Sequence, residues 1–236
     1  MHVLVMAKAP VPGRVKTRLC PPCTPTGAAA LAEAALADTL EAVMASGADR
    51  RVLALDGAPG PWLPAGFQVV AQCGGNFDRR LTHAWSEAGG PGIQIGMDTP
   101  QVTAALLDDA LAALDAADAA LGYAADGGWW AIGLRRPHLG AFHGVPMSTA
   151  RTGRAQEARL RSLGLDVALL PTLADLDTVA DLPAVLASGA AARTARVAAI
   201  LGLVPAPAPA TPAVAPAPSA LAPAPAPVPP VLAPAG

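Results

Sequence analysis

The chain has 236 residues, which is enough for one domain with a sizeable core and an appended segment. Apolar residues make up 53% of the chain and aromatic residues only 3%, so the core must be built mainly from Ala, Leu and Val. A net charge of -2 excludes a general attraction to nucleic acid or to an anionic membrane. A phosphate-bearing ligand would therefore need a local cluster of basic residues.

The N-terminal residues predict a buried strand and no targeting segment. Residues 1–7 are apolar, but they lack a basic leader and run directly into Lys8. The sequence has no apolar stretch of about 18 residues free of Pro and charge. We therefore expect no membrane span and a cytoplasmic location.

The three cysteines do not make a disulfide framework. Cys20 and Cys23 have the spacing of a redox or zinc pair, but a second pair is missing and the two lie in a Pro-rich stretch. Free thiols without a chemical role are the favoured interpretation, and redox or metal roles are the alternatives.

The predicted elements alternate between strands and helices. In chain order they are a strand at 2–7, a helix at 27–46, strands at 51–56 and 67–71, a helix at 77–88, a strand at 92–96, a helix at 103–114, strands at 119–124 and 129–134, a helix at 150–163, a strand at 166–170 and a helix at 179–187. This pattern predicts an α/β fold whose mostly parallel sheet is covered on both faces. In such a sheet ligands lie beyond the carboxyl ends of the strands, which points to the segments after Ala7, Gly96, Ala124 and Leu170.

The segment after the first strand is strongly basic. It places Lys8, Arg14, Lys16 and Arg18 among Pro and Gly residues that delay helix formation. The backbone amides of such a loop can surround phosphate oxygens while the cations neutralise their charge. The loop lacks the Gly-Lys-Ser/Thr ending of a Walker A motif. A phosphate site is the favoured interpretation, and a solvated basic loop is the alternative.

Asp98 follows the strand at 92–96 and precedes a Thr-Pro turn. A carboxylate at this place can begin a metal site, because Mg²⁺ is commonly held by one or two carboxylates plus substrate phosphates. The alternative is that Asp98 caps the next helix. Thr99 and Thr103 are equally good caps, which leaves Asp98 free for a cation.

The run Asp126-Gly127-Gly128 predicts a tight turn that lets the backbone approach a ligand closely. Trp129 and Trp130 follow it in a strand, so one indole is expected to face the core and the other to line a pocket. A plain hairpin is the alternative explanation of the turn.

Asp175 and Asp177 lie at positions i and i+2 of an extended segment and share one side of it, a spacing suited to one cation. Capping of the following helix by Asp177 or Thr178 explains the same residues equally well.

The composition changes sharply after Val204. Residues 205–236 contain 12 of the 26 prolines and no charge. Since each proline fixes φ and removes a donor, we expect an extended and disordered segment. We therefore divide the chain into a catalytic domain at 1–203 and a disordered Pro/Ala-rich tail at 204–236. A passive tail is the favoured interpretation, and contact with an unknown partner is the alternative.

Together these motifs resemble a known family. The segments 9–19, 96–100, 126–129, 132–135 and 175–178 have the order and spacing found in the DUF2064 proteins. These are bacterial members of the glycosyltransferase-A, or nucleotide-diphospho-sugar transferase, superfamily, and they are similar to molybdenum-cofactor guanylyltransferase and phospholactate guanylyltransferase. The resemblance implies a Rossmann-like three-layer α/β/α fold with a nucleotide bound over the loop after the first strand.

The resemblance also implies roles for individual residues. The nucleotide would be bound by Lys8, Ala9, Pro10, Gly13, Arg14, Lys16 and Arg18. Mg²⁺ or Mn²⁺ would be held by Asp98 with Asp177 and Asp175, and catalysis would depend on Asp98, Lys16 and Arg18. The acceptor side would be bordered by Asp126, Gly127, Gly128, Trp129, Ser148 and Thr149. Where the family usually has Leu-Gly-x-Arg, this chain has Phe77-Asp78-Arg79-Arg80.

The activity implied by the resemblance is glycosyl transfer from a nucleotide-diphospho-sugar to a small-molecule acceptor, with a metal ion. One alternative is a guanylyltransferase-like nucleotidyltransferase that joins a nucleoside triphosphate to a phosphorylated acceptor and releases pyrophosphate. A second anion would need further cations, and the candidates are Arg135, Arg136, Arg151 and Arg154. The third possibility is a nucleotide-binding protein without turnover. No nucleic-acid partner is expected.

Overall fold

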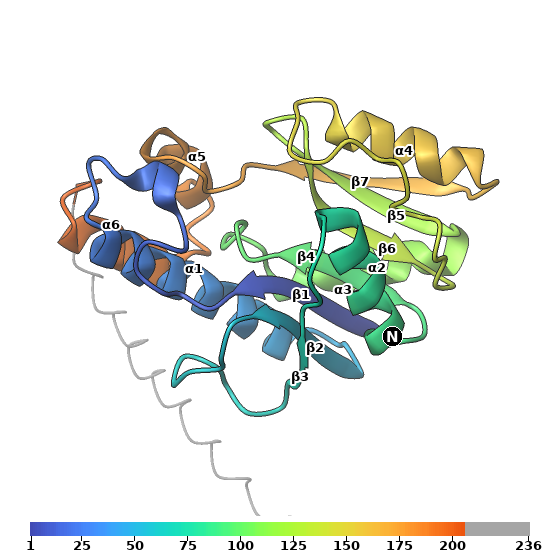
Figure 1. The fold of residues 1–236 in the computed structure, drawn as a ribbon, viewed down its shortest axis with the longest axis horizontal. Helices are drawn as coiled ribbons and strands as arrows, with labels where there is room; N and C mark the ends of the chain where they lie inside the picture. Colours follow the sequence, from blue (N-terminus) through green and yellow to red (C-terminus); the bar gives the residue numbers. More distant parts are fainter. Residues whose placement is uncertain (206–236) are drawn as a thin grey trace, which may run out of the picture.

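A seven-stranded sheet organises residues 1–205, the part of the chain that the computed structural model describes (Figure 1). The strand order is β3-β2-β1-β4-β6-β5-β7, and β6 runs antiparallel to its two neighbours while the other pairs are parallel. All but the first two residues of the tail predicted at 204–236 lie outside the described residues. The strands are β1 (His2–Lys8), β2 (Arg50–Asp56), β3 (Gln68–Ala71), β4 (Gly92–Gly96), β5 (Ala119–Ala124), β6 (Trp129–Leu134) and β7 (Val167–Leu173).

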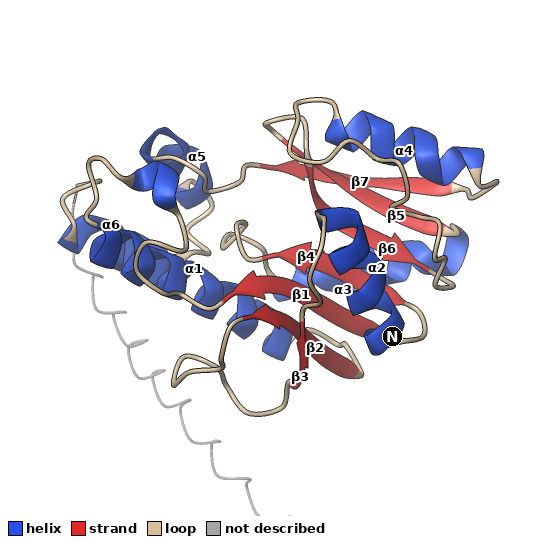
Figure 2. Ribbon diagram, in the orientation of Figure 1, coloured by secondary structure: helices blue, strands red, loops and turns tan. Residues whose placement is uncertain are grey.

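Helices cover both faces of this sheet (Figure 2). On one face Val5 and Ile95 pack with residues of α1 (Pro25–Ala45) and α3 (Ala104–Ala116). On the other face Leu4 and Ile132 pack with residues of α2 (Phe77–Ala88) and α4 (Thr152–Ser162). Neighbouring strand residues point to opposite faces, so both faces of the apolar strands are buried. The predicted three-layer α/β fold is confirmed.

A smaller apolar cluster joins α1 to the last helices of the described chain. These helices lie beside α1 and away from the sheet (Figure 1). The cluster includes Leu19 of the basic loop, Leu31 of α1 and Leu182 of α5. Because Leu19 is fully buried there, the cluster anchors the far end of the basic loop. The elements around it are the 3-10 turns η1 (Thr17–Leu19) and η2 (Val179–Asp181) and the helices α5 (Leu182–Leu186) and α6 (Ala192–Ile200).

The secondary structure differs from the sequence predictions mainly after residue 178. The predicted helix at 179–187 is wrong as a single element, because it divides into η2 and α5. Pro183 lies in the first turn of α5 and has no N–H, so an α-helical hydrogen bond cannot run through this position. Helix α6 was not predicted. Thr194 and Ala198 are its buried residues, which is too weak an apolar pattern to mark a helix.

Two further predictions concern the cysteines and the membrane. Cys20, Cys23 and Cys73 are all free, as expected. None of the helices in the described part of the chain is long and apolar enough to cross a membrane.

Candidate functional site

The carboxyl ends of the strands open onto one cavity of about 560 Å³. The basic loop after β1, Asp98 after β4, Asp126 after β5 and Asp175 after β7 all line it, as the strand pattern predicted. The predicted site residues that line the cavity are Lys8, Arg14, Lys16, Arg18, Asp98, Asp126, Gly128, Trp129, Ser148, Thr149, Asp175 and Asp177. The cavity wall does not include Ala9, Pro10, Gly13 or Gly127.

The basic loop makes two turns in the left-handed region of the backbone. Gly13 has φ +76°, and Lys16 has φ 49° and ψ 37°. This conformation is uncommon for a residue with a Cβ and costs on the order of 1 kcal/mol. Such strain persists only where surrounding contacts hold it, and Lys16 makes those contacts. Its side chain is only 6% exposed, whereas that of Arg18 is 72% exposed.

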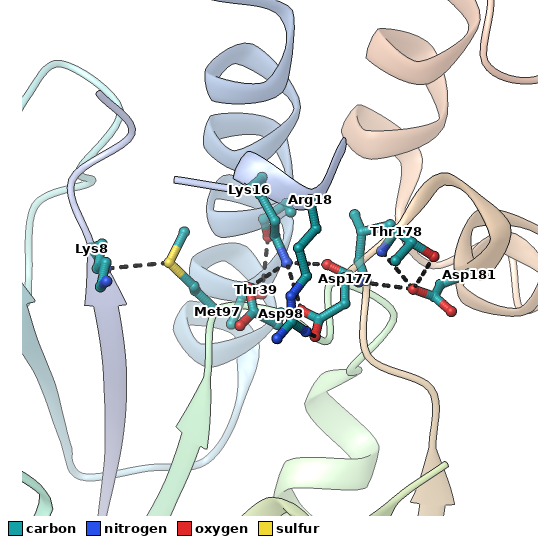
Figure 3. A network of polar contacts seen from close by, with 11 residues as sticks. Lys8, Lys16, Arg18, Thr39, Met97, Asp98, Asp177, Thr178 and Asp181 are labelled. Carbon is teal, nitrogen blue, oxygen red and sulfur yellow. Dashed lines mark hydrogen bonds and ion pairs between the residues drawn. The ribbon is translucent and has the colours of Figure 1, made fainter. Parts of the chain in front are cut away.

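The ammonium group of Lys16 lies among oxygen atoms from two segments (Figure 3). Its Nζ is 2.5 Å from Asp98 Oδ1 and 3.9 Å from Asp177 Oδ1, and it donates a hydrogen bond to the carbonyl of Leu176. Arg18 Nη1 donates to Asp177 Oδ2 at 2.9 Å. The amide of Leu176 donates to the carbonyl of Asp98 at 2.7 Å, which ties the two acidic segments together. The Lys16 ammonium group thus supplies the positive charge among these oxygen atoms.

Neither Asp98 nor Asp177 caps a helix. Helix α3 is capped by Thr103, whose Oγ1 accepts from the amide of Leu106 at 3.2 Å. Before η2, the amide and hydroxyl of Thr178 donate to the Asp181 carboxylate at 2.6 and 3.0 Å. The capping alternative is therefore wrong for Asp98 and Asp177, but it is confirmed for Thr178, which forms a capping box with Asp181 at the start of η2.

Asp175 completes the acidic side of the cavity. Burial raises the pKa of Asp175 to about 8, and the neighbouring Asp98, Asp126 and Asp177 carboxylates add to this rise while Lys16 opposes it. The four carboxyl groups therefore lie close enough to disfavour one another's charged forms.

Within residues 1–205 no three His, Cys, Asp or Glu side chains are arranged as a ready metal site. The donors beside Lys16 nevertheless suit Mg²⁺ or Mn²⁺, because two carboxylates and the Leu176 carbonyl converge on one positive charge and all are oxygen atoms. Mg²⁺ needs only one or two carboxylates when phosphates of a substrate supply the other ligands. The residues present thus fit a metal that binds together with a nucleotide.

The turn after β5 brings a second loop against the cavity. Gly127 has φ +91°, and a Cβ there would lie 2.1 Å from the carbonyl oxygen of Ala150. Only glycine permits this close approach, which keeps the wall formed by Ser148 and Thr149 in place. Asp126 Oδ1 accepts from the amide of Gly128 at 2.7 Å and fixes the turn.

One of the two adjacent indoles lies in the core as expected, although both Trp129 and Trp130 line the cavity. Trp130 is 2% exposed and its Nε1 donates to the carbonyl of Pro171 at 2.9 Å, so it belongs to the core. Trp129 is half-buried and lines the cavity.

Some cavity residues were not predicted, and some predicted cations lie elsewhere. The additional residues in the wall include Gln72, Phe77, Arg80 and Gln94. Two signals in the sequence were available, the glutamine in the otherwise apolar strand β4 and the segment 77–80, which stands where the family usually has Leu-Gly-x-Arg. The four arginines considered for a second anion, Arg135, Arg136, Arg151 and Arg154, are not in the wall. Arg135 pairs with Asp118, which lies just before the amino end of β5, whereas the cavity lies at its carboxyl end.

The fold is that of a nucleotide-diphospho-sugar transferase type of α/β protein. The chain is similar to a candidate nucleotide-diphospho-sugar transferase from Desulfovibrio desulfuricans G20, with a TM-score of 0.74 and 27% identity over 85% of this chain and 95% of that chain. Two structures of Rv0371c from Mycobacterium tuberculosis H37Rv, one of them a manganese complex, have TM-scores of 0.49 and 0.46, with 21% identity over 79% of this chain and 97% of theirs.

The family of the chain follows from its sequence. Residues 30–149 match the profile of DUF2064, described as an uncharacterized protein conserved in bacteria, so the chain belongs to this family. The matched stretch contains Asp98 and Asp126, while the basic loop and Asp177 lie outside it. No curated protein matches the sequence.

Proposed function

We propose that this protein is a metal-dependent glycosyltransferase that uses a nucleotide-diphospho-sugar donor. The observation that carries the proposal is the meeting of the basic loop with the carboxylates of two other segments in one cavity, with Lys16 Nζ 2.5 Å from Asp98. The similarity to the Desulfovibrio protein supports the same class of donor.

The basic loop would hold the diphosphate. Lys8 and Arg14 line the cavity and form no ion pair with any carboxylate of residues 1–205, so their charges are available to phosphate oxygens. Lys16 and Arg18 would join them when a ligand draws them away from Asp98 and Asp177. A bound diphosphate would thus meet cations from four positions of a single loop.

The acidic segments would hold the metal ion. Asp98 and Asp177, with the carbonyl of Leu176 and the carboxyl group of Asp175, offer the oxygen ligands for Mg²⁺ or Mn²⁺. A bound divalent cation supplies positive charge to the departing diphosphate.

In the reaction an acceptor hydroxyl attacks the anomeric carbon, the bond from that carbon to the diphosphate oxygen breaks, and the nucleoside diphosphate leaves. The proton of the hydroxyl passes to the departing diphosphate or to water. The contribution of the basic loop is electrostatic, because cations fixed near the leaving oxygens stabilise the charge that develops there. Asp126 and Trp129 border the side of the cavity from which the acceptor would approach.

Nucleotidyl transfer is the second candidate. It would use the same loop and carboxylates, but a phosphorylated acceptor would attack the α-phosphate of a nucleoside triphosphate and release pyrophosphate. One observation favours it, namely that Arg80, in the wall of the cavity, has no acidic partner among residues 1–205.

Thermal unfolding with a panel of nucleoside triphosphates and nucleotide-sugars, with and without Mg²⁺ or Mn²⁺, tests the proposal. A ligand at about 100 times its Kd adds roughly 2.7 kcal/mol to the stability, which is easily seen. A metal-dependent shift with a nucleotide-sugar supports glycosyl transfer, and a shift with a triphosphate alone moves the assignment to nucleotidyl transfer. If a cooperatively melting protein responds to none of them, the nucleotide proposal is wrong.

Product release separates an enzyme from a binding protein. Asp98→Asn should abolish both turnover and the metal-dependent part of the shift while the melting temperature of the free protein stays close to wild type. Asp109→Asn, an exposed position on α3, is the matched control. A wild-type protein that binds nucleotide but releases no product would show a binding protein without turnover.

A further inference from the structure

Arg80 is a half-buried cation for which residues 1–205 provide no carboxylate. It lies in the first turns of α2 and lines the cavity, yet it forms no ion pair within the described part of the chain. Its Nε atom is buried and has no hydrogen-bond partner. A guanidinium group in such a place is costly unless an anion completes its surroundings. The unpaired charge therefore indicates an anionic ligand.

The guanidinium group is held in position from two sides. Gln72 Oε1 accepts from Arg80 Nη1 at 3.2 Å, and the Arg80 guanidinium lies 5.0 Å over the ring of Phe77. Gln72 is itself fixed, because its Nε2 donates to the carbonyls of Ala7 and Ala54 at 2.9 Å each. Since these carbonyls lie near the carboxyl ends of β1 and β2, the sheet positions the Arg80 guanidinium group through Gln72.

Two more side chains line the same cavity. Gln94 of β4 is 1% exposed, and its Oε1 has no hydrogen-bond partner. Trp129 of β6 is half-buried and presents an indole to the same cavity. An unpaired cation, an unpaired amide oxygen and an aromatic surface together suit a ligand that has an anionic group and a hydroxyl or amine donor.

We propose that Arg80, held by Gln72 and Phe77, is the anion-binding residue of an acceptor subsite that recognises a phosphate or carboxylate group. The subsite lies on α2, β4 and β6 and is separate in the chain from the basic loop that would hold the nucleotide. This inference rests on the proposed function and adds the class of acceptor to it. In nucleotidyl transfer the anionic group is the attacking phosphate, and in glycosyl transfer it restricts the acceptors to anionic ones.

Three probes with one carbon skeleton test this assignment. Glycerol 3-phosphate, glycerate and glycerol are titrated into the protein, which already carries the nucleotide that stabilises it most, and the Arg Nε–H signals are followed by NMR. The comparison is made among wild type, Arg80→Met and Arg79→Met, the matched control on the exposed neighbouring position. Arg80→Lys keeps the charge and much of the packing and serves if Arg80→Met does not fold.

We expect at least one anionic probe, and not glycerol, to bind wild type and Arg79→Met about tenfold or more tightly than Arg80→Met, with Arg80→Lys between them. The phosphate and carboxylate arms identify which anion the subsite takes. Nucleotide affinity should differ by less than about twofold among the four proteins.

Two results would overturn the assignment. One is equal binding of the anionic probes by Arg80→Met and Arg79→Met. The other is a loss of nucleotide affinity in Arg80→Met as large as the loss for the probes, which would place Arg80 in the nucleotide site. A wild type that binds no nucleotide contradicts the proposed function instead, and the same probes titrated into the free protein still decide the role of Arg80.

Discussion

Replacing Lys16 with Met should strengthen the binding of Mn²⁺ when no nucleotide is present. The ammonium group lies between the carboxylates of Asp98 and Asp177, at 2.5 and 3.9 Å, so a metal ion must compete with it for the same oxygens. Methionine has nearly the same length and keeps the apolar stem of the side chain in place. The substitution removes the competing charge together with the hydrogen bond to the carbonyl of Leu176.

The expected size follows from the distances and the exposure. A pair of unit charges about 4 Å apart at an effective dielectric constant of 20 interacts by about 4 kcal/mol. Asp98 and Asp177 are 45% and 39% exposed, so solvent screening reduces this value toward that of surface pairs, about 1 kcal/mol or less. An intermediate value of about 1.4 kcal/mol corresponds to a tenfold lower Kd for Mn²⁺.

Electron paramagnetic resonance of free Mn²⁺ measures the affinity directly, and Lys8→Met is the control. Lys8 belongs to the same loop but forms no ion pair with Asp98 or Asp177. Both variants lose one positive charge, so a general charge effect should appear equally in the two. Only Lys16→Met should gain the additional affinity, and both should bind nucleotide less tightly than wild type.

The reasoning would be refuted by a Lys16→Met protein that binds Mn²⁺ no better than Lys8→Met. In that case the carboxylates would not be the metal ligands, or the ammonium would not compete with the ion. A wild type that binds Mn²⁺ only with nucleotide, together with a Lys16→Met protein that binds it alone, is the strongest form of the expected result.

Two further predictions concern stability. The pKa of Asp175 in the folded state is raised to about 8 from 3.8, so the folded state retains a proton that the unfolded state has lost. Between about pH 4 and pH 8 the stability of wild type relative to Asp175→Asn should therefore fall by up to about 1.4 kcal/mol per pH unit. Urea unfolding at several pH values measures this difference, and a difference that grows in favour of wild type with pH would contradict the prediction. Asp38→Ala should lower the free energy of unfolding by about 2–3 kcal/mol in urea, because the buried Asp38 carboxylate accepts from the amide and hydroxyl of Thr194 at 2.8 Å each and so holds the start of α6. The control Glu41→Ala removes an exposed partner of Arg193 and should cost under about 1 kcal/mol. Equal losses in the two variants would show that the buried contact with Thr194 is not what stabilises α6.

The sheet could be predicted from the sequence because its strands are apolar on both faces and short turns separate them from helices. Strands 92–96, 119–124 and 129–134 and the helix at 77–88 have the predicted bounds. The antiparallel direction of β6 follows from the short turn at 125–128, which joins β5 and β6 as a plain hairpin, the alternative explanation of this turn. The existence of α6, in contrast, depends on contacts between distant parts of the chain. Asp38, in the middle of α1, determines where α6 begins, and no local pattern near residue 192 contains that information.

The site could be predicted only as a set of segments. The rule that ligands lie at the carboxyl ends of strands placed the basic loop, Asp98, Asp126 and Asp175 at one edge, and all of them line the cavity. The partners of each charge could not be predicted. The sequence marks Arg80 only as the last residue of the segment that stands where the family has Leu-Gly-x-Arg. Its hydrogen bond to the fixed amide of Gln72 and the absence of a carboxylate partner in the described chain come from the structure.

The charges of the cavity argue that nucleotide and metal bind together. Its wall contains five basic side chains, Lys8, Arg14, Lys16, Arg18 and Arg80, and four carboxyl groups, of which Asp175 stays protonated at neutral pH because its pKa is raised to about 8. The resulting excess of positive charge suits a diphosphate but disfavours a divalent cation alone. When phosphates draw Lys16 toward themselves, Asp98 and Asp177 lose their counter-ion, and the loss of the Asp175 proton becomes favourable only if another cation arrives. The bound nucleotide therefore frees carboxylates for the metal ion, and the bound metal ion frees Lys16 for the phosphates. The nucleotide and the metal ion must then raise each other's affinity by the same factor.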